Sequence, residues 1–283
     1  MKCRLVISLL CGLFSTSSYT SDVLHIPHVG RDKEALSYEV LKLALEKSNV
    51  NSQLRQADPS YNNARLITEV EAGNIDVIWA GASPDKDQRL KAIRVPILKG
   101  LVGYKLLIIR GQDQSAFDRI NSLEALKRYQ AGQKFSWADT KILLDAGVPT
   151  VTSIRYPNLF KMLEGGRFDY FPRGVLDDPW QEVNNHAHLN LKVEDRLILA
   201  YPHALYFYVN KDNDTLYRQI HDGFESAIKD GSFNELFFSN QWVKSIIERS
   251  DLKHRTILKI DNVLMHEDTP YDRSDYWLDS SLL

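Results

Sequence analysis

Serine and arginine side chains at predicted turns are the residues of this sequence best suited to bind a small anion. Ser83-Pro84-Asp85 has a serine that can cap a helix, a proline at the first helical position and an acid in the first turn. The N–H groups at such a helix end can hold an anion. The guanidinium of Arg89 would add a bidentate pair of hydrogen bonds to a carboxylate. The alternative for Arg89 is a surface position on a short helix.

A second predicted helix begins with the capping box Ser136-Trp137-Ala138-Asp139. Helix capping alone would account for this sequence. If the helix end faces a ligand, Ser136 and the neighbouring N–H groups add another anion-binding turn, and Trp137 forms a wall on which the ligand stacks. Trp79, at the end of an apolar run, is either a core residue or a further wall, and we include it among the predicted ligand contacts.

Two more turns carry arginine directly after a predicted strand. Arg155-Tyr156 follows one strand and Arg173 follows another, and the loops at these ends bind ligands in open α/β sheets. Arg173 could instead form an ion pair with Asp177 or Asp178. We predict that Arg155, Tyr156 and Arg173 contact a ligand.

Side chains for catalysis or metal binding are poorly arranged. His25 and His28 stand three residues apart on a predicted strand, so their side chains would point to opposite faces. The sequence has no nucleophile elbow, phosphate-binding loop or dinucleotide-binding glycine motif. We therefore expect no catalytic residue, no metal and no cofactor.

The first twenty residues have the order of a secretory signal peptide. Lys2 and Arg4 precede an apolar stretch from Leu5 to Phe14, and small polar residues follow. Both cysteines of the chain lie in this segment, so the exported protein would contain none. No later segment has the 18 apolar residues of a membrane span. We predict residues 1–20 to be a signal peptide and the mature chain to be periplasmic, without membrane insertion.

Charge and element order define the class of protein. The 35 basic and 37 acidic residues leave no basic excess of the kind that nucleic-acid binders show. After the signal segment, strand patterns alternate with helix patterns, which favours an α/β lobe. The predicted strands and helices of this first part are, in order, 23–29, 33–48, 53–57, 62–73 and 76–81.

Two strand-like segments, near 103–110 and 204–210, enclose a second and smaller α/β unit. A lobe that is interrupted by another and then resumed has two chain crossings and a cleft between the lobes, which suits closure around a small ligand. We predict a discontinuous first lobe of residues 21–105 and 206–283, and a second lobe of residues 106–205.

Motifs in this order resemble those of type 2 periplasmic solute-binding proteins, in the amino-acid-binding branch. A strand that ends in glycine, a serine turn, an arginine, a proline and a crossing strand map onto Gly81, Ser83, Arg89, Pro96 and the segment Tyr104 to Ile109. Later segments that also resemble the family are GQKFSWADTKILLDAG, EGGRFDYFPRGVLDDP and IKDGSFNELFFSNQW. The resemblance implies a two-lobe α/β fold and a monomeric, non-enzymatic binding protein that serves an ABC-type permease or a membrane sensor.

One departure from the family pattern concerns the ligand. Amino-acid binders place an aspartate four residues after the position of Asp169, where it meets the ligand ammonium, and here that position is Arg173. With Arg89 expected on the opposite lobe, we predict a small polar, anionic ligand without a free ammonium beside Arg173. The alternatives are a hydrolase or lyase on the same fold and an accessory protein that does not take part in transport.

Overall fold

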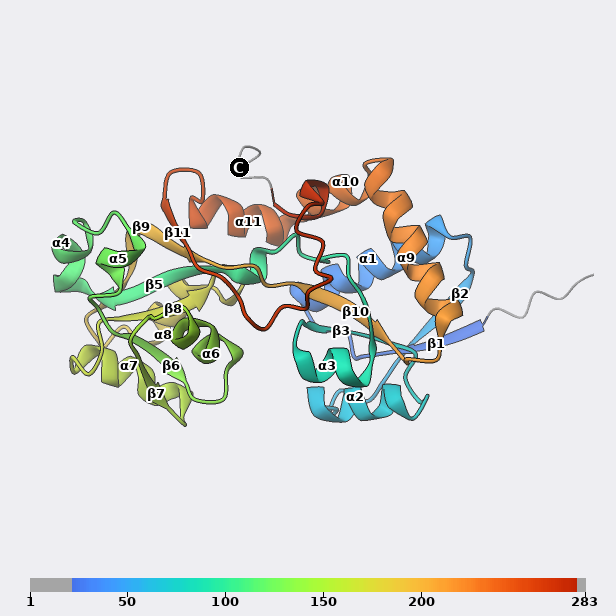
Figure 1. Cartoon of the computed structure of the whole chain (residues 1–283), viewed down its shortest axis with the longest axis horizontal. Helices are drawn as coiled ribbons and strands as arrows, with labels where there is room; N and C mark the ends of the chain where they lie inside the picture. Colours follow the sequence, from blue (N-terminus) through green and yellow to red (C-terminus); the bar gives the residue numbers. More distant parts are fainter. Residues whose placement is uncertain (1–21, 279–283) are drawn as a thin grey trace, which may run out of the picture.

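The computed structural model describes residues 22–278, and Figure 1 shows that they form two lobes side by side. The alternation of strand and helix predicted for residues 23–81 is confirmed, with ends shifted by a few residues. These elements are β1 (Asp22–Ile26), α1 (Lys33–Lys47), β2 (Ser52–Gln56), α2 (Asn63–Glu71) and β3 (Val77–Gly81).

The first lobe contains two small sheets covered by helices. β1 pairs with β2 in parallel, and β10 (Leu205–Val209) lies antiparallel between β3 and β4 (Lys91–Ile93). All five residues of β10 are buried, as expected for a central strand with apolar groups on both faces. The helices of this lobe besides α1 and α2 are α3 (Pro84–Arg89), α9 (Asp214–Lys229) and α10 (Ser232–Ser239).

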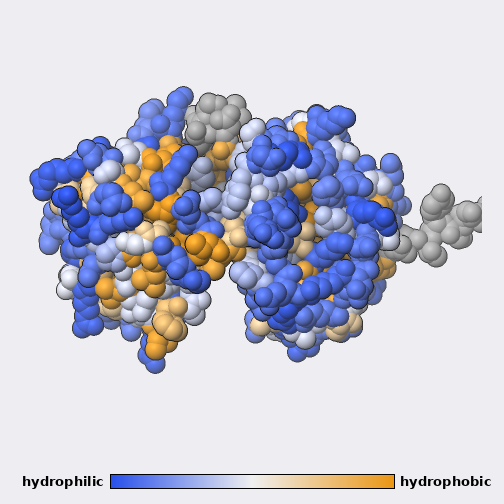
Figure 2. Space-filling model, in the orientation of Figure 1, coloured by the Kyte–Doolittle hydropathy of each residue, from blue (hydrophilic) through white to orange (hydrophobic). Residues whose placement is uncertain are grey.

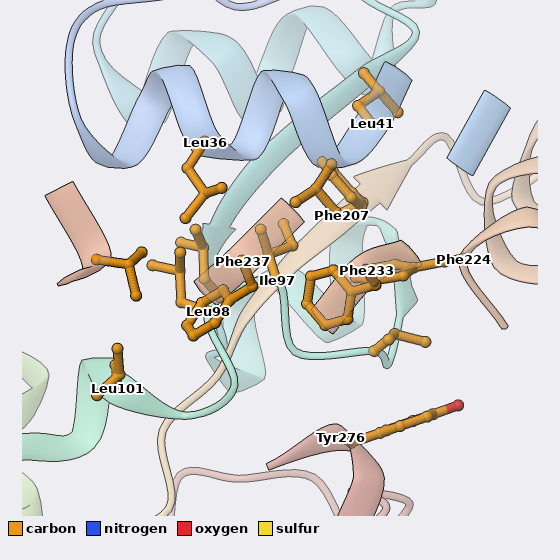
Figure 3. Packing of buried hydrophobic residues seen from close by; sticks show 14 of the residues in the cluster. Leu36, Leu41, Ile97, Leu98, Leu101, Phe207, Phe224, Phe233, Phe237 and Tyr276 are labelled. Atoms are coloured by element: carbon orange, nitrogen blue, oxygen red, sulfur yellow. The ribbon is translucent and has the colours of Figure 1, made fainter. Parts of the chain in front are cut away.

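Aromatic and branched side chains from distant parts of the chain fill the core of the first lobe. In Figure 3, Leu36 and Leu41 of α1 point down toward Phe207 of β10, with Phe233 and Phe237 of α10 nearby. The ring of Phe224 packs edge-to-face on Phe233 at a centroid distance of 4.8 Å, a favourable geometry for aromatic pairs. This core holds the sheet in place, and strand β3 of that sheet leads directly into α3.

Gly223 allows α9 to approach α1 closely. A Cβ atom at position 223 would lie 1.8 Å from the carbonyl oxygen of Ala44 and 2.5 Å from Oγ of Ser48. Gly223→Ala should therefore push the two helices apart and lower the free energy of unfolding by about 1–3 kcal/mol. Urea denaturation measures this loss, and Gly30→Ala is the control because its nearest neighbouring atom would be 3.9 Å away. Equal stability of the two variants would contradict the packing argument.

The second lobe is built on a mixed six-stranded sheet in the order β11-β9-β5-β8-β6-β7. Its central strand, β5 (Tyr104–Arg110), has a continuous apolar run that is buried on both faces. The other strands are β6 (Ala131–Lys134), β7 (Thr150–Ser153), β8 (Tyr170–Gly174), β9 (Leu191–Ala200) and β11 (Thr256–Lys259). Its helices are α4 (Gln114–Phe117), α5 (Leu123–Leu126), α6 (Ala138–Asp145), α7 (Tyr156–Glu164) and α8 (Pro179–Asn185).

The C-terminal part of the chain departs from the proposed division into lobes. After α11 (Gln241–Ser250), strand β11 pairs in parallel with β9, and Leu258 is buried in the core of the second lobe. Tyr276 and Leu278 are instead buried with residues of the first lobe. The segment 256–278 thus contacts both lobes, which corrects the predicted placement of residues 206–283 wholly in the first lobe.

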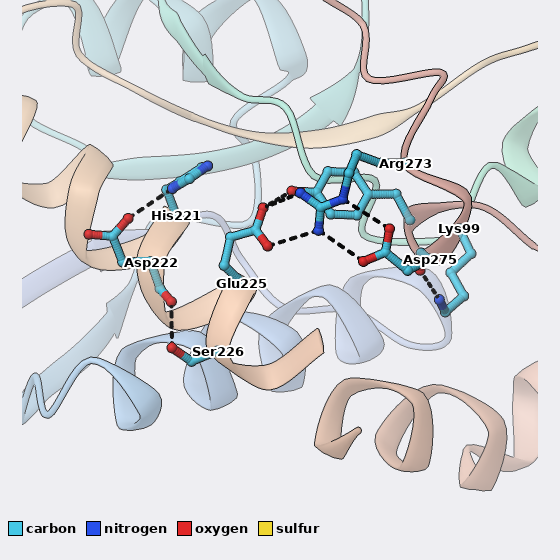
Figure 4. A network of polar contacts seen from close by, with 8 residues as sticks. Lys99, His221, Asp222, Glu225, Ser226, Arg273 and Asp275 are labelled. Carbon is cyan, nitrogen blue, oxygen red and sulfur yellow. Dashed lines mark hydrogen bonds and ion pairs between the residues drawn. The ribbon is translucent and has the colours of Figure 1, made fainter. Parts of the chain in front are cut away.

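An ionic network anchors the end of this segment to the first lobe. Figure 4 shows the guanidinium of Arg273 between the carboxylates of Glu225 and Asp275, with Lys99 beyond. Arg273 contacts both oxygens of Glu225 at 3.0 Å, and Nζ of Lys99 donates to the carbonyl of Asp275 at 2.8 Å. Within residues 22–278, no helix has the length and apolar character needed to cross a bilayer. The predicted signal peptide lies outside the described residues.

Candidate ligand-binding site

A cavity of about 580 Å³ lies between the two lobes, at the ends of β3 and β8. Helices α3 and α6 face each other across the gap in Figure 1, and Figure 2 shows the surface hollowed between the lobes. Side chains from both lobes line the cavity, and several of them are charged. The volume is in the range of small-molecule sites in proteins.

The wall on the first lobe contains a lysine that has no acidic partner. Ser83 caps α3, and its Oγ accepts a hydrogen bond of 2.7 Å from Nζ of Lys86. No carboxylate among residues 22–278 lies within ion-pair distance of this ammonium, and Asp87 on the same helix pairs with Arg94 at 3.3 Å. Burial lowers the pKa of Lys86, against the weaker opposing effect of Asp85 and Asp87. Lys86 is thus a partly desolvated cation that faces the cavity.

On the second lobe, a buried lysine is neutralised by an aspartate. Nζ of Lys105 on β5 lies 2.6 Å from Oδ1 of Asp139, in the first turn of α6. The hydroxyl of Tyr201 also donates to this carboxylate. Burial alone would raise the pKa of Asp139, but the charge of Lys105 and the hydrogen bonds from Lys105 and Tyr201 together hold it well below its usual range. The carboxylate of Asp139 therefore compensates the charge of Lys105 within the protein.

Arg173 is held in the same way. Its guanidinium makes two hydrogen bonds to Glu182, of 2.7 and 2.6 Å, and contacts Asp177 at 3.2 Å. It also lies over the ring of Trp137 at 4.9 Å, within the range of a cation–π contact. Burial alone would lower the pKa of Arg173, but Glu182 and Asp177 raise it. The arginine is charged, and its charge is already compensated by the protein.

Comparisons with known proteins place the fold. No family model matches the sequence and no curated protein matches it, whereas many solved structures resemble this structure. One is ytmK of Bacillus subtilis, a probable amino-acid ABC transporter extracellular-binding protein, with 15% identity, a TM-score of 0.56 and coverage of 79% of this chain and 99% of that one. Another is YCKB of Bacillus subtilis, with 17% identity, a TM-score of 0.52 and coverage of 85% and 97%.

The chain has the two-lobe fold of periplasmic binding proteins. The expected α/β architecture is thereby confirmed. In this binding-protein fold the cavity occupies the interlobe position that the sequence predicted. The described residues contain no group of three or more histidine, cysteine, aspartate or glutamate side chains placed to hold a metal ion.

Five of the eight predicted contact residues come together in the cavity of the binding-protein fold, and three do not. Those that line it are Trp79, Ser83, Ser136, Trp137 and Arg173. The first two belong to the first lobe and the other three to the second, so the predicted turns do meet across the cleft.

Arg89 does not line the cavity, which corrects its predicted position. It is the last residue of α3, so its side chain leaves from the end of the helix that is remote from Ser83. It pairs there with Glu71 of α2 through two hydrogen bonds of 2.8 and 2.5 Å. The structure therefore assigns Arg89 the surface position that was the alternative.

Arg155 and Tyr156 also lie outside the cavity lining. Arg155 is exposed at the start of α7. The hydroxyl of Tyr156 donates to Glu182 at 2.6 Å, and its ring lies 5.6 Å from that of Trp137. Tyr156 thus supports Glu182, which in turn holds Arg173.

Sequence reasoning missed Lys86, Lys105 and His203, which all line the cavity. A signal existed for Lys86, because it follows Ser83-Pro84-Asp85 within the first turn of the capped helix. No local signal marks the other two, since they lie on the chain crossings, where the pattern shows strand and turn but not which side chains face the cleft.

Glu182 offers a test of the internal pairing of Arg173. Glu182→Gln would leave the buried guanidinium with one carboxylate, on the partly exposed Asp177. We expect the free energy of unfolding to fall by about 1.5–3 kcal/mol, because the variant loses one compensating charge and also one of the two hydrogen bonds. The amide nitrogen of glutamine donates and cannot accept from the guanidinium. Chemical denaturation measures the change, with Glu164→Gln on the exposed face of α7 as the control. A Glu182→Gln protein as stable as the control would show that Arg173 does not need this partner.

Proposed function

We propose that the protein is a non-enzymatic solute-binding protein that captures a small polar ligand in the interlobe cavity. The observation that carries the proposal is a cavity lined by charged side chains from both lobes of a binding-protein fold. In such an arrangement a ligand contacts both lobes and favours the closed form. The shared fold with a probable amino-acid ABC transporter extracellular-binding protein supports this role.

The ligand should carry an anionic group, and Lys86 is the residue we assign to it. Lys105 and Arg173 already have carboxylate partners, whereas Lys86 has only the hydroxyl of Ser83. A partly buried cation without a partner is costly, and a ligand carboxylate would compensate it. Arg89 lies outside the cavity and Arg173 is paired with Glu182, so the two arginines do not face each other as free cations. An ammonium elsewhere on the ligand is therefore compatible with the cavity.

The division into lobes, the partners and the location complete the proposal. We retain two lobes joined near residues 105 and 205, with 256–259 added to the second. The protein would act as a monomer that delivers its ligand to an ABC-type permease or a membrane sensor, after export to the periplasm.

Export predicts that protein purified from the periplasm begins near Ser21. N-terminal sequencing determines this start.

Mass spectrometry of molecules released from the purified, denatured protein tests the function. We expect a stoichiometric small anion or zwitterion. Adding it back should compact the protein in small-angle scattering and raise the free energy of unfolding by about 2.7 kcal/mol at one hundred times its Kd. Chemical conversion of the molecule, or saturation without compaction, would contradict a binding protein that closes on its ligand.

A further inference from the structure

His203 lies where the chain crosses from the second lobe to the first, between β9 and β10. Its side chain lines the interlobe cavity, and the residue is only 9% exposed. The ring stacks with that of Tyr201 at a centroid distance of 6.4 Å and an interplanar angle of 27°. On the side of the first lobe it faces Gly81, where a Cβ would lie 3.4 Å from Nε2. The imidazole therefore sits at the hinge, between the two walls of the site.

The ring lacks a hydrogen-bond partner of its own. Nδ1 of His203 is buried, and no described residue accepts from it or donates to it. Buried polar atoms normally have a partner, because losing water without a replacement costs free energy. The neighbouring polar groups of Lys105 and Tyr201 are instead directed to Asp139.

The charges around the ring favour an anion. Lys86 of α3, Lys105 of β5 and Asp139 of α6 are the charged groups that act on His203. Burial, followed by the charges of Lys105 and Lys86, lowers the pKa of His203 to about 4, although Asp139 opposes this. The imidazole is neutral near pH 7, and Lys86, which lines the same cavity, has no carboxylate partner. An anionic group placed between these two side chains would satisfy both.

We propose that His203 is a ligand-binding residue whose ring hydrogen-bonds the anionic group that Lys86 holds. This inference rests on the proposed function and names a specificity-determining contact within it. Because His203 belongs to the crossing segment, the ligand would bind the hinge as well as the first lobe. The hydrogen bond between His203 and the ligand would then couple ligand binding to the conformation of the segment between β9 and β10.

The proposal predicts that binding takes up protons. An anion close to the imidazole favours its charged form, and an opposite charge at this distance commonly raises a pKa by about 1–3 units. The affinity should therefore increase on the order of tenfold between pH 7.5 and pH 5. Neutral and protonated rings can both donate to the anion, so binding persists at pH 7.5.

Calorimetry with succinate, N-acetyl-L-glutamate and L-glutamate as probes tests the proposal. Titrations at pH 5.5 in two buffers of different ionisation enthalpy report the number of protons taken up. We expect uptake approaching one proton for the unaltered protein and for His221→Gln, a control on α9 whose side chain pairs with Asp222. His203→Gln should lose this uptake and the gain in affinity at low pH.

Equal proton uptake and affinity in His203→Gln would overturn this proposal alone. Failure of every probe to bind the unaltered protein would contradict the proposed ligand class, and this contact with it. A second measurement on the unaltered protein keeps the proposal testable if His203→Gln does not fold. The ring C–H resonances of His203 should titrate at higher pH when a bound probe is present, and an unchanged midpoint would also overturn the proposal.

Discussion

Replacing Lys86 with methionine should weaken ligand binding by about 2–5 kcal/mol, the usual result of removing one partner of a buried charge pair. This corresponds to a loss of affinity of about thirtyfold or more. The reason is that Lys86 is the cavity cation without a carboxylate partner, so the ligand anion loses its compensating charge. Methionine keeps most of the length of the unbranched side chain, which largely separates the effect of charge from that of shape.

Arg89→Ala is the matched control for this prediction. Arg89 lies on the same helix, but it pairs with Glu71 outside the cavity. Calorimetry on both variants should show near-normal binding for Arg89→Ala and a large loss for Lys86→Met, with both melting temperatures close to that of the unaltered protein. The reverse result would restore the assignment of Arg89 to the ligand and remove Lys86 from the site.

Acidification should destabilise the unliganded protein through His203. The pKa of His203 is lowered from an ordinary 6.5 to about 4 in the folded state, so the unfolded chain binds a proton over this interval that the folded chain does not. Stability contributed by the neutral ring is complete above pH 6.5 and is lost as the pH falls toward 4. The expected loss is about 3 kcal/mol by pH 4.

Unfolding curves at several pH values isolate this effect. His203→Gln should show a flatter dependence of stability on pH between 6.5 and 5, whatever its stability at pH 7. Asp139 acts in a different window, because its lowered pKa produces a loss only as the pH falls below about 4. Parallel curves for the two proteins between pH 6.5 and 5 would show that His203 is not kept neutral by the fold.

Local patterns were sufficient to predict the elements and the position of the cleft. The apolar run of β5 and the Ser83 cap of α3 depend on neighbours in the chain, so periodicity and turn chemistry reveal them. The capping box predicted at Ser136 is wrong, because α6 begins at Ala138 and Trp137 stands at its N-cap position without a side-chain hydrogen bond. The two crossings followed from the order of strands and helices. The turns that face the cleft come directly after strands, and Ser83 and Ser136 lie in such turns. Both serines could therefore be assigned to the cavity from the sequence.

The sequence by itself determined an α/β protein with two crossings and polar turns that meet in a cleft, whereas the tertiary structure decided which charges remain for a ligand. Arg89 and Arg173 look equally available in the sequence, yet Glu71 neutralises one and Glu182 the other. Ion pairing depends on distances of a few ångströms between side chains of different elements, and element order does not encode them. For the same reason, only the tertiary structure shows that Lys86 has no carboxylate partner and that His203 lines the same cavity.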